Sequence, residues 1–154
     1  MLLLLSACAG EVVGPSLAKR PIESRSMAEP VREIARPAPA DATLTGRIAG
    51  LVERARAGQR DFAALRTRAE AAAAAAGPQG SESWIAAQQL LSALEGARGP
   101  TTAALAELDR MILDGLAGGN EAGTVELQQA NAEVAALVTA QQRDFDSLRN
   151  RIVR

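Results

Sequence analysis

The sequence has 154 residues but contains no His, no Tyr and only one Cys. Without His, no imidazole is present to act as a general base or a metal ligand. A single Cys allows neither an internal disulfide nor a zinc site built from cysteines. The 17 basic and 18 acidic residues nearly cancel, which argues against nucleic-acid binding, since that needs a basic face. We therefore expect no catalytic residue, no metal and no cofactor.

Residues that favour β-strands are also scarce. The chain has 8 Val, 6 Ile and three aromatic side chains (Phe62, Trp84 and Phe145), whereas 34 residues are Ala. Ala has the highest helix propensity and buries little surface. We therefore predict an all-α fold with a thin core. The length suits one domain with a tail and is too short for two full domains.

Apolar and small residues recur in alternating steps of four and three from residue 44 to residue 76, as on one buried face of a helix. This series predicts a helix over 42–76, with Asp41 or Thr43 as its N-cap and Gly77-Pro78 at its end. The series consists of Leu44, Ile48, Leu51, Ala55, Gly58, Phe62, Leu65, Ala69, Ala72 and Ala76.

The same spacing predicts a second helix over 82–117, capped by Ser81 or Ser83 and interrupted by Gly99-Pro100. A proline inside a helix breaks or kinks it. The series nevertheless stays in phase across the proline, which a reversal of the chain would not require, so we favour one kinked helix. The alternative is a reversal at Pro100, which gives four helices. The series consists of Trp84, Ala87, Leu91, Leu94, Arg98, Thr101, Leu105, Leu108, Ile112 and Gly115.

A third helix is predicted over 121–152, capped by Asn120 or Thr124. Three helices of similar length with short connections predict an elongated antiparallel three-helix bundle over 41–154. Asn131 and Gln141 lie on the apolar face of the third helix, where polar residues often fix the register of packing. The six Arg of the first helix and the five acids of the second are expected to steer their pairing.

The carboxylates of the predicted bundle offer little chemistry. Asp109 with Asp114, and Asp144 with Asp146, lack the spacing of three or four residues that places side chains on one face of a helix. The run 115–119 is rich in Gly but lacks the GK[ST] ending and the preceding strand of a phosphate-binding loop, so we interpret it as a helix end. Trp84 is expected to pack in the core.

Residues 8–40 are of a different composition. Five of the seven prolines lie here, and no apolar periodicity of useful length appears. Prolines every six to nine residues forbid a long helix, so we predict a disordered tether.

The first eight residues read Met-Leu-Leu-Leu-Leu-Ser-Ala-Cys. The segment Leu5-Ser6-Ala7-Cys8 resembles the lipobox of bacterial lipoproteins, with an apolar residue and two small residues before the Cys. The resemblance implies that residues 1–7 are a signal peptide, that cleavage falls before Cys8, and that Cys8 carries acyl chains such as palmitate. The apolar stretch is short and has no basic segment before it, so we expect the coding sequence to begin further upstream.

The resemblance also predicts a location and partners. Ala9 stands where an Asp would resemble the signal for retention in the inner membrane, which favours the periplasmic face of the outer membrane. The expected partners are membrane lipid, through acylated Cys8, and a protein or a second copy, through the helix faces. One alternative is a cytosolic coiled-coil interaction protein that starts near Met27. Another is a subunit of an enzyme complex whose catalytic residues lie on another chain.

Overall fold

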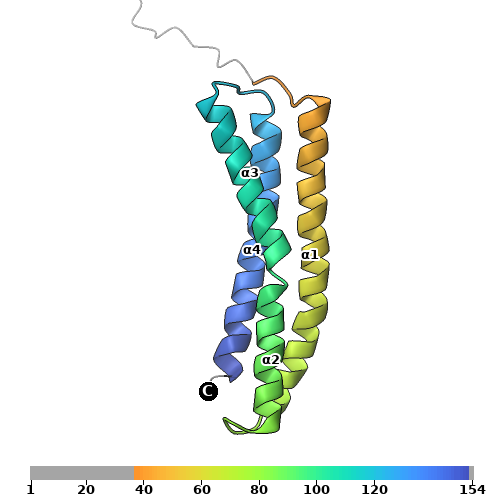
Figure 1. Ribbon diagram of the computed structural model, residues 1–154, viewed down its shortest axis with the longest axis vertical. Coiled ribbons are helices and arrows are strands. Elements are labelled where there is room, and N and C mark those ends of the chain that lie inside the picture. The colour runs from red at the N-terminus through yellow and green to blue at the C-terminus, as the bar shows by residue number, and fades with distance from the viewer. Residues whose placement is uncertain (1–36, 153–154) are drawn as a thin grey trace, which may run out of the picture. The chain divides into compact units, whose positions relative to one another are not determined.

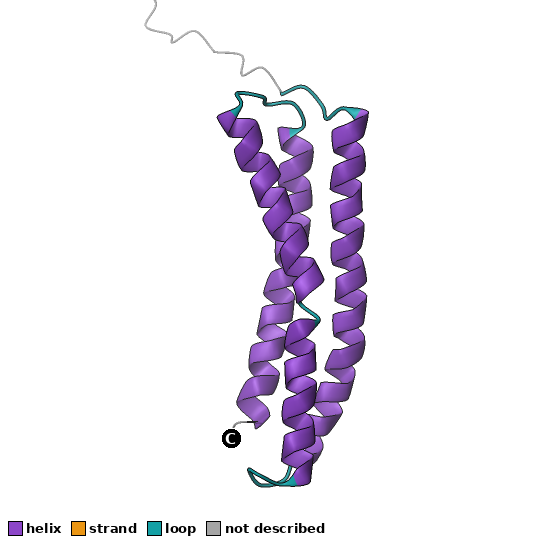
Figure 2. Cartoon of the chain, viewed as in Figure 1, coloured by secondary structure: helices purple, strands orange, loops and turns teal. Residues whose placement is uncertain are grey.

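The computed structural model describes residues 37–152, which form an all-helical bundle (Figure 2). Its helices are α1 (Ala42–Ala75), α2 (Glu82–Gly96), α3 (Gly99–Ala117) and α4 (Thr124–Ile152). α3 continues in the direction of α2, so these two helices together make the middle of three antiparallel arms (Figure 1). The chain does not reverse at Pro100, and the elongated three-helix bundle is the fold that the sequence predicts.

The ends of α1 and the start of α2 follow from local capping. The carboxylate of Asp41 accepts a hydrogen bond from the backbone N–H of Leu44 at 2.7 Å, which satisfies one of the free donors at the start of α1. α1 ends one residue earlier than predicted, before Ala76 in an extended conformation. The hydroxyl of Ser81 accepts from the N–H of Trp84 at 3.3 Å and caps α2.

The break between α2 and α3 is centred on Ala97 and Arg98. Both residues keep helical dihedral angles, so the chain changes its hydrogen bonding here without turning back. Pro100 lies in the first turn of α3, where its missing N–H leaves no helical hydrogen bond unmade. The close approach of this turn to α1 requires a glycine. A Cβ built on Gly58 would lie 2.9 Å from the hydroxyl oxygen of Thr101 and 3.1 Å from Cβ of Pro100.

The connection into α4 differs from the prediction. The helix begins at Thr124, three residues later than expected, because a turn occupies residues 121–123. Asn120 accepts from the N–H of Ala122 within this turn, and the hydroxyl of Thr124 donates to the carbonyl of Glu121. Neither side chain caps the helix as the sequence suggested. Gly123 has a φ of 76°, which favours glycine, and its backbone accepts from Leu127.

Residues just before α1 contact this turn. The N–H of Gly123 donates to the carbonyl of Ala38 at 2.8 Å, and the N–H of Ala40 donates to the carboxylate of Glu126 at 3.4 Å. The sequence assigned residues 37–40 to the tether, but Ala38 and Ala40 lie against the start of α4.

The core is divided into two apolar halves. The first half contains Ile48, Leu51, Ala55, Ala104, Leu108, Met111, Leu127, Ala130 and Val134. The second half contains Phe62, Ala69, Ala87, Leu91, Leu94, Phe145, Leu148 and Ile152. Besides Thr101, the buried positions of α3 are Ala104, Leu108 and Met111, whereas Leu105 and Ile112 of the predicted series are only partly buried.

A buried polar layer lies between the two halves of the core. Gln141 and Thr101 are both fully buried. The amide nitrogen of Gln141 donates to Gln59 at 2.9 Å and to the hydroxyl oxygen of Thr101 at 3.1 Å, and that hydroxyl donates to the carbonyl of Ala55 at 3.3 Å. The layer connects α1, α3 and α4 at the level of the helix break. Such a layer disfavours shifted packings of the helices, because a shift would bury its groups without partners.

Candidate functional site

The lipidation motif that the sequence predicts, Leu5, Ser6, Ala7 and Cys8, lies outside the described residues, as does Met27. Among the described residues, no group of three or more His, Cys, Asp or Glu side chains could hold a metal ion. None of the helices in the described part of the chain is long and apolar enough to cross a bilayer.

The two carboxylate pairs do not form a shared site. Asp109 accepts a hydrogen bond from Asn131 at 2.6 Å, and Asp114 pairs with Arg110 at 3.0 Å. Asp144 pairs with Arg66 at 2.7 Å, and the arginine has a raised pKa because it hydrogen-bonds to that carboxylate. Each of these carboxylates thus has a partner of its own.

The other residues that the sequence singled out, on α4 and at the start of α2, make contacts within the bundle. Asp146 pairs with Arg149 at 3.0 Å and accepts from Gln142. Trp84 is half-buried beside the second half of the core, and its indole N–H donates to the carbonyl of Ile152 at 3.1 Å. Asn131 is half-exposed, so of the two polar residues predicted to lie on the apolar face only Gln141 is buried.

The most developed concave surface runs between α1 and α3, and we call it the α1–α3 groove. Figure 1 shows α3 leaning away from α1 towards the connection with α4. The groove consists of two cavities of about 410 and 480 Å³, which share Arg47 as a lining residue. Together they are lined by Leu44, Gly46, Arg47, Gly50, Leu51, Arg54, Ala103, Glu107, Arg110, Met111, Ile112, Asp114, Gly115, Asn120, Ala122, Thr124 and Leu127.

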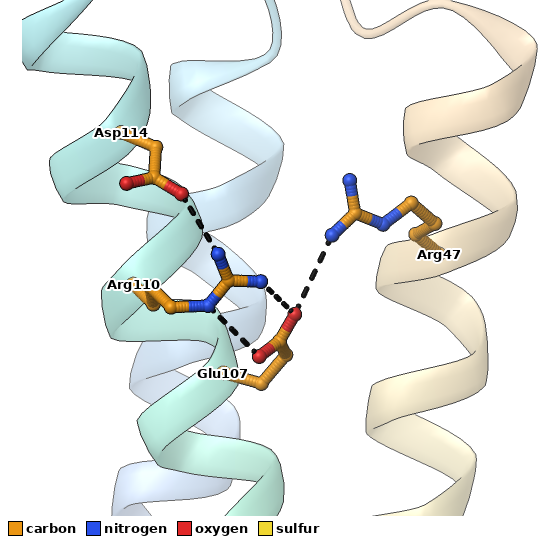
Figure 3. Close-up of polar contacts among 4 residues, drawn as sticks. All are labelled: Arg47, Glu107, Arg110 and Asp114. Atoms are coloured by element: carbon orange, nitrogen blue, oxygen red, sulfur yellow. Dashed lines mark hydrogen bonds and ion pairs between the residues drawn. The ribbon is translucent and has the colours of Figure 1, made fainter.

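The two walls of the groove differ in charge. On the α1 wall, Arg47 and Arg54 are exposed cations seven residues apart. On the α3 wall, Glu107, Arg110 and Asp114 form a series of ion pairs with helical spacing (Figure 3). Arg47 reaches across the groove to the Glu107 carboxylate, at 3.4 Å. The floor between these walls is apolar, with Leu51, Met111 and Leu127 almost fully buried.

Electrostatics within the groove centre on Glu107. Its carboxylate accepts from Nη2 of Arg110 at 2.6 Å and from Nε of the same residue at 3.1 Å. These hydrogen bonds lower the pKa of Glu107, and the charges of Arg110 and Arg47 act in the same direction. The hydrogen bond to Glu107 raises the pKa of Arg110. Glu107 and Arg110 therefore stay ionised at neutral pH and present fixed charges rather than a proton donor or acceptor.

Sequence reasoning missed this groove. The predicted series included Leu44 and Leu51 but not Met111 of the floor. Gly46 and Gly50 had no predicted role, and Arg47 and Arg54 were expected only to steer the pairing of helices. The available signal was a pair of glycines four residues apart on the outer side of a helix, alternating with two arginines seven residues apart.

Comparison with known proteins does not supply a function. No family model matches the chain, and neither the curated proteins nor the solved structures contain a significant match.

Proposed function

We propose that this chain is a lipid-anchored protein of the bacterial envelope whose helical bundle binds a partner protein and catalyses no reaction. The observation that carries the anchor is the segment Leu5-Ser6-Ala7-Cys8, which places the only Cys of the chain directly after an apolar residue and two small ones. Two or three acyl chains on Cys8 hold a protein on a membrane durably, whereas a single chain does not.

The binding role is supported by the charges and shape of the bundle. The α1–α3 groove combines an apolar floor with charged walls, which suits recognition of another chain more than acid–base chemistry, because Glu107 and Arg110 pair with each other and keep their charges. The predicted tether of residues 8–40 would let the bundle reach a partner at some distance from the lipid, on the order of 30 Å if it is a flexible coil.

The test is to express the protein from its native gene in a bacterium fed with a fatty acid that carries an alkyne label. We expect the wild-type chain to take up the label and to sediment with membranes. Cys8→Ser should abolish the label and leave the thermal melting of the bundle unchanged. A matched control, Cys8→Ser with Ser16→Cys, keeps one thiol but moves it away from the motif, and it should stay unlabelled.

Two outcomes would contradict the proposal. If the wild-type chain took up no label, Cys8 would not be acylated and the proposed lipid anchor would be wrong. A label on the double variant would show that any exposed thiol near the start is acylated, so that the motif itself has no role.

A further inference from the structure

The α1 wall of the groove is open to close approach. A Cβ built on Gly46 or on Gly50 would meet no heavy atom within 4 Å, so neither glycine is required by packing within the bundle. A glycine in an exposed helix is less favourable than an alanine, so helix stability does not favour glycine at these positions either. The two lie about one turn apart, Gly46 beside Arg47 and Gly50 between Arg47 and Arg54, so the backbone of α1 carries no side chain at either position.

The cations of this wall are only weakly engaged within the described bundle. Glu107 already accepts two hydrogen bonds from Arg110, and Arg47 adds a single longer contact to it while its side chain stays 55% exposed. Arg54 is exposed and has no ion pair among the described residues. Arg47 can therefore exchange Glu107 for another carboxylate, and the wall carries an excess of positive charge.

We propose that the α1–α3 groove binds an acidic helix of a partner protein. Arg47 and Arg54 are seven residues apart, so their Cα atoms are separated by about 10.5 Å along the axis of α1. Carboxylates seven residues apart on a helix packed nearly parallel or antiparallel to α1 have the same separation. Gly46 and Gly50 allow that helix to approach at the short end of the usual 8–10 Å between helix axes. The apolar floor would bury the small or apolar residues between the carboxylates.

A second copy of this chain fits the groove less well. Within the described residues, the acidic pairs seven apart include Glu107 with Asp114 and Glu126 with Glu133. Glu107 and Asp114 are both held by Arg110. Glu133 pairs with Arg56 at 2.7 Å, and Glu126 accepts from the backbone of Ala40. Self-association through these helices would have to break those contacts, whereas a separate protein brings free carboxylates.

This inference deepens the proposed binding role and does not depend on the lipid anchor. The test is to select binders of the purified full chain from a library of Ala-rich helical peptides with randomised outer positions. We expect the selected peptides to carry Asp or Glu two turns apart. The best peptide should bind about tenfold more tightly than its counterpart with Lys at those positions, because the wall is cationic.

Two variants and two controls locate the binding. Gly50→Leu fills open space on an exposed helix, so it should keep the fold and weaken the peptide affinity by about tenfold or more. Arg54→Glu should weaken it by about tenfold through repulsion of the acidic peptide. Ala64→Leu and Arg68→Glu make the same changes on exposed positions of α1 outside the groove, and both should bind as the wild type does.

Four outcomes would overturn the inference. They are peptides selected without acidic residues, no selected peptide at all, affinity that Gly50→Leu leaves unchanged, and self-association of the chain that Gly50→Leu abolishes. The last outcome would identify a second copy as the occupant. Cys8→Ser should bind the same peptide with unchanged affinity, so a bare Cys8 would remove the lipid anchor without touching the groove.

Discussion

Two glycines of α1, Gly58 and Gly50, allow the packing at the helix break to be tested by the same substitution. Gly58 is buried beneath the first turn of α3, where an added Cβ would lie 2.9 Å from the hydroxyl of Thr101 and 3.1 Å from Cβ of Pro100. Thr101 cannot simply rotate away, because its hydroxyl donates to the carbonyl of Ala55. Gly50 lies on the same helix with open space around the position of a Cβ.

The magnitudes follow from two effects. Replacement of Gly by Ala in the interior of a helix stabilises the folded protein by about 0.5–1 kcal/mol, and this gain applies to both sites. At Gly58 the added methyl overpacks a close helix contact, which typically costs about 1–3 kcal/mol. We therefore expect Gly50→Ala to raise the free energy of unfolding by about 0.5–1 kcal/mol, and Gly58→Ala to leave it unchanged or lower it by up to about 2.5 kcal/mol.

The assay is urea denaturation of the full chain followed by circular dichroism at 222 nm, a wavelength that reports helix. The difference between the two variants is the informative quantity, because it cancels the shared gain in helix propensity. A difference of about 1–3 kcal/mol supports the close approach of α3 to α1 at Pro100. Equal stabilisation by both substitutions would refute it, since it would mean that Gly58 faces open space.

Two further predictions concern the polar layer and the groove. Thr101→Val should destabilise the bundle by about 1–3 kcal/mol, because it leaves one N–H of the buried Gln141 amide without a partner. Gln141→Leu should cost less than about 1 kcal/mol, since it removes that whole amide, including the buried Oε1 that has no partner. The urea denaturation midpoints of the two variants measure these losses of stability. A lower midpoint for Gln141→Leu than for Thr101→Val would contradict the reasoning. Because Arg110 lowers the pKa of folded Glu107, this carboxylate should stabilise the bundle above its unfolded pKa of about 4.3 and lose that effect as the pH falls through the lower folded value. Glu107→Gln should remove this part of the acid dependence of thermal melting, and an unchanged pH profile would count against the ion pair.

The fold could be predicted from the sequence because the spacing of apolar residues is a direct record of which helix faces are buried. The series kept its phase across Gly99-Pro100, and the structure keeps one direction there, with Ala97 and Arg98 in helical conformation. The prediction was less accurate where small residues decide the packing. Ala104 is buried in place of Leu105, because the close approach of α3 to the other helices favours the smaller side chain.

Other features depend on contacts between distant parts of the chain, which a local pattern does not record. A glycine occupies position 123, just before α4, because Leu44 and Ala40 leave no room for a side chain there. The charge pattern suggested that α1 pairs with the second predicted helix, but Arg56 and Arg66 pair with Glu133 and Asp144 of α4. Between α1 and the segment formed by α2 and α3, the ion pair of Arg47 with Glu107 is formed.

The groove was missed for a related reason. A glycine in a helix is usually interpreted only as a residue that destabilises the helix. That Gly46 and Gly50 border open space depends on how α1 packs beside α3, which the local sequence does not show. The sequence pattern identified part of the floor of the groove, such as Leu51, because that part is apolar and periodic. The charged residues of the walls belong to no periodic apolar series.

The most direct test of the account is the intact mass of the chain purified from bacterial membranes. The account predicts a mass that lacks residues 1–7 and includes acyl chains on Cys8, carried by a helical bundle. A chain in the soluble fraction that begins at Met27, or one that retains an unmodified Cys8, would contradict the lipid anchor on which the proposed function rests.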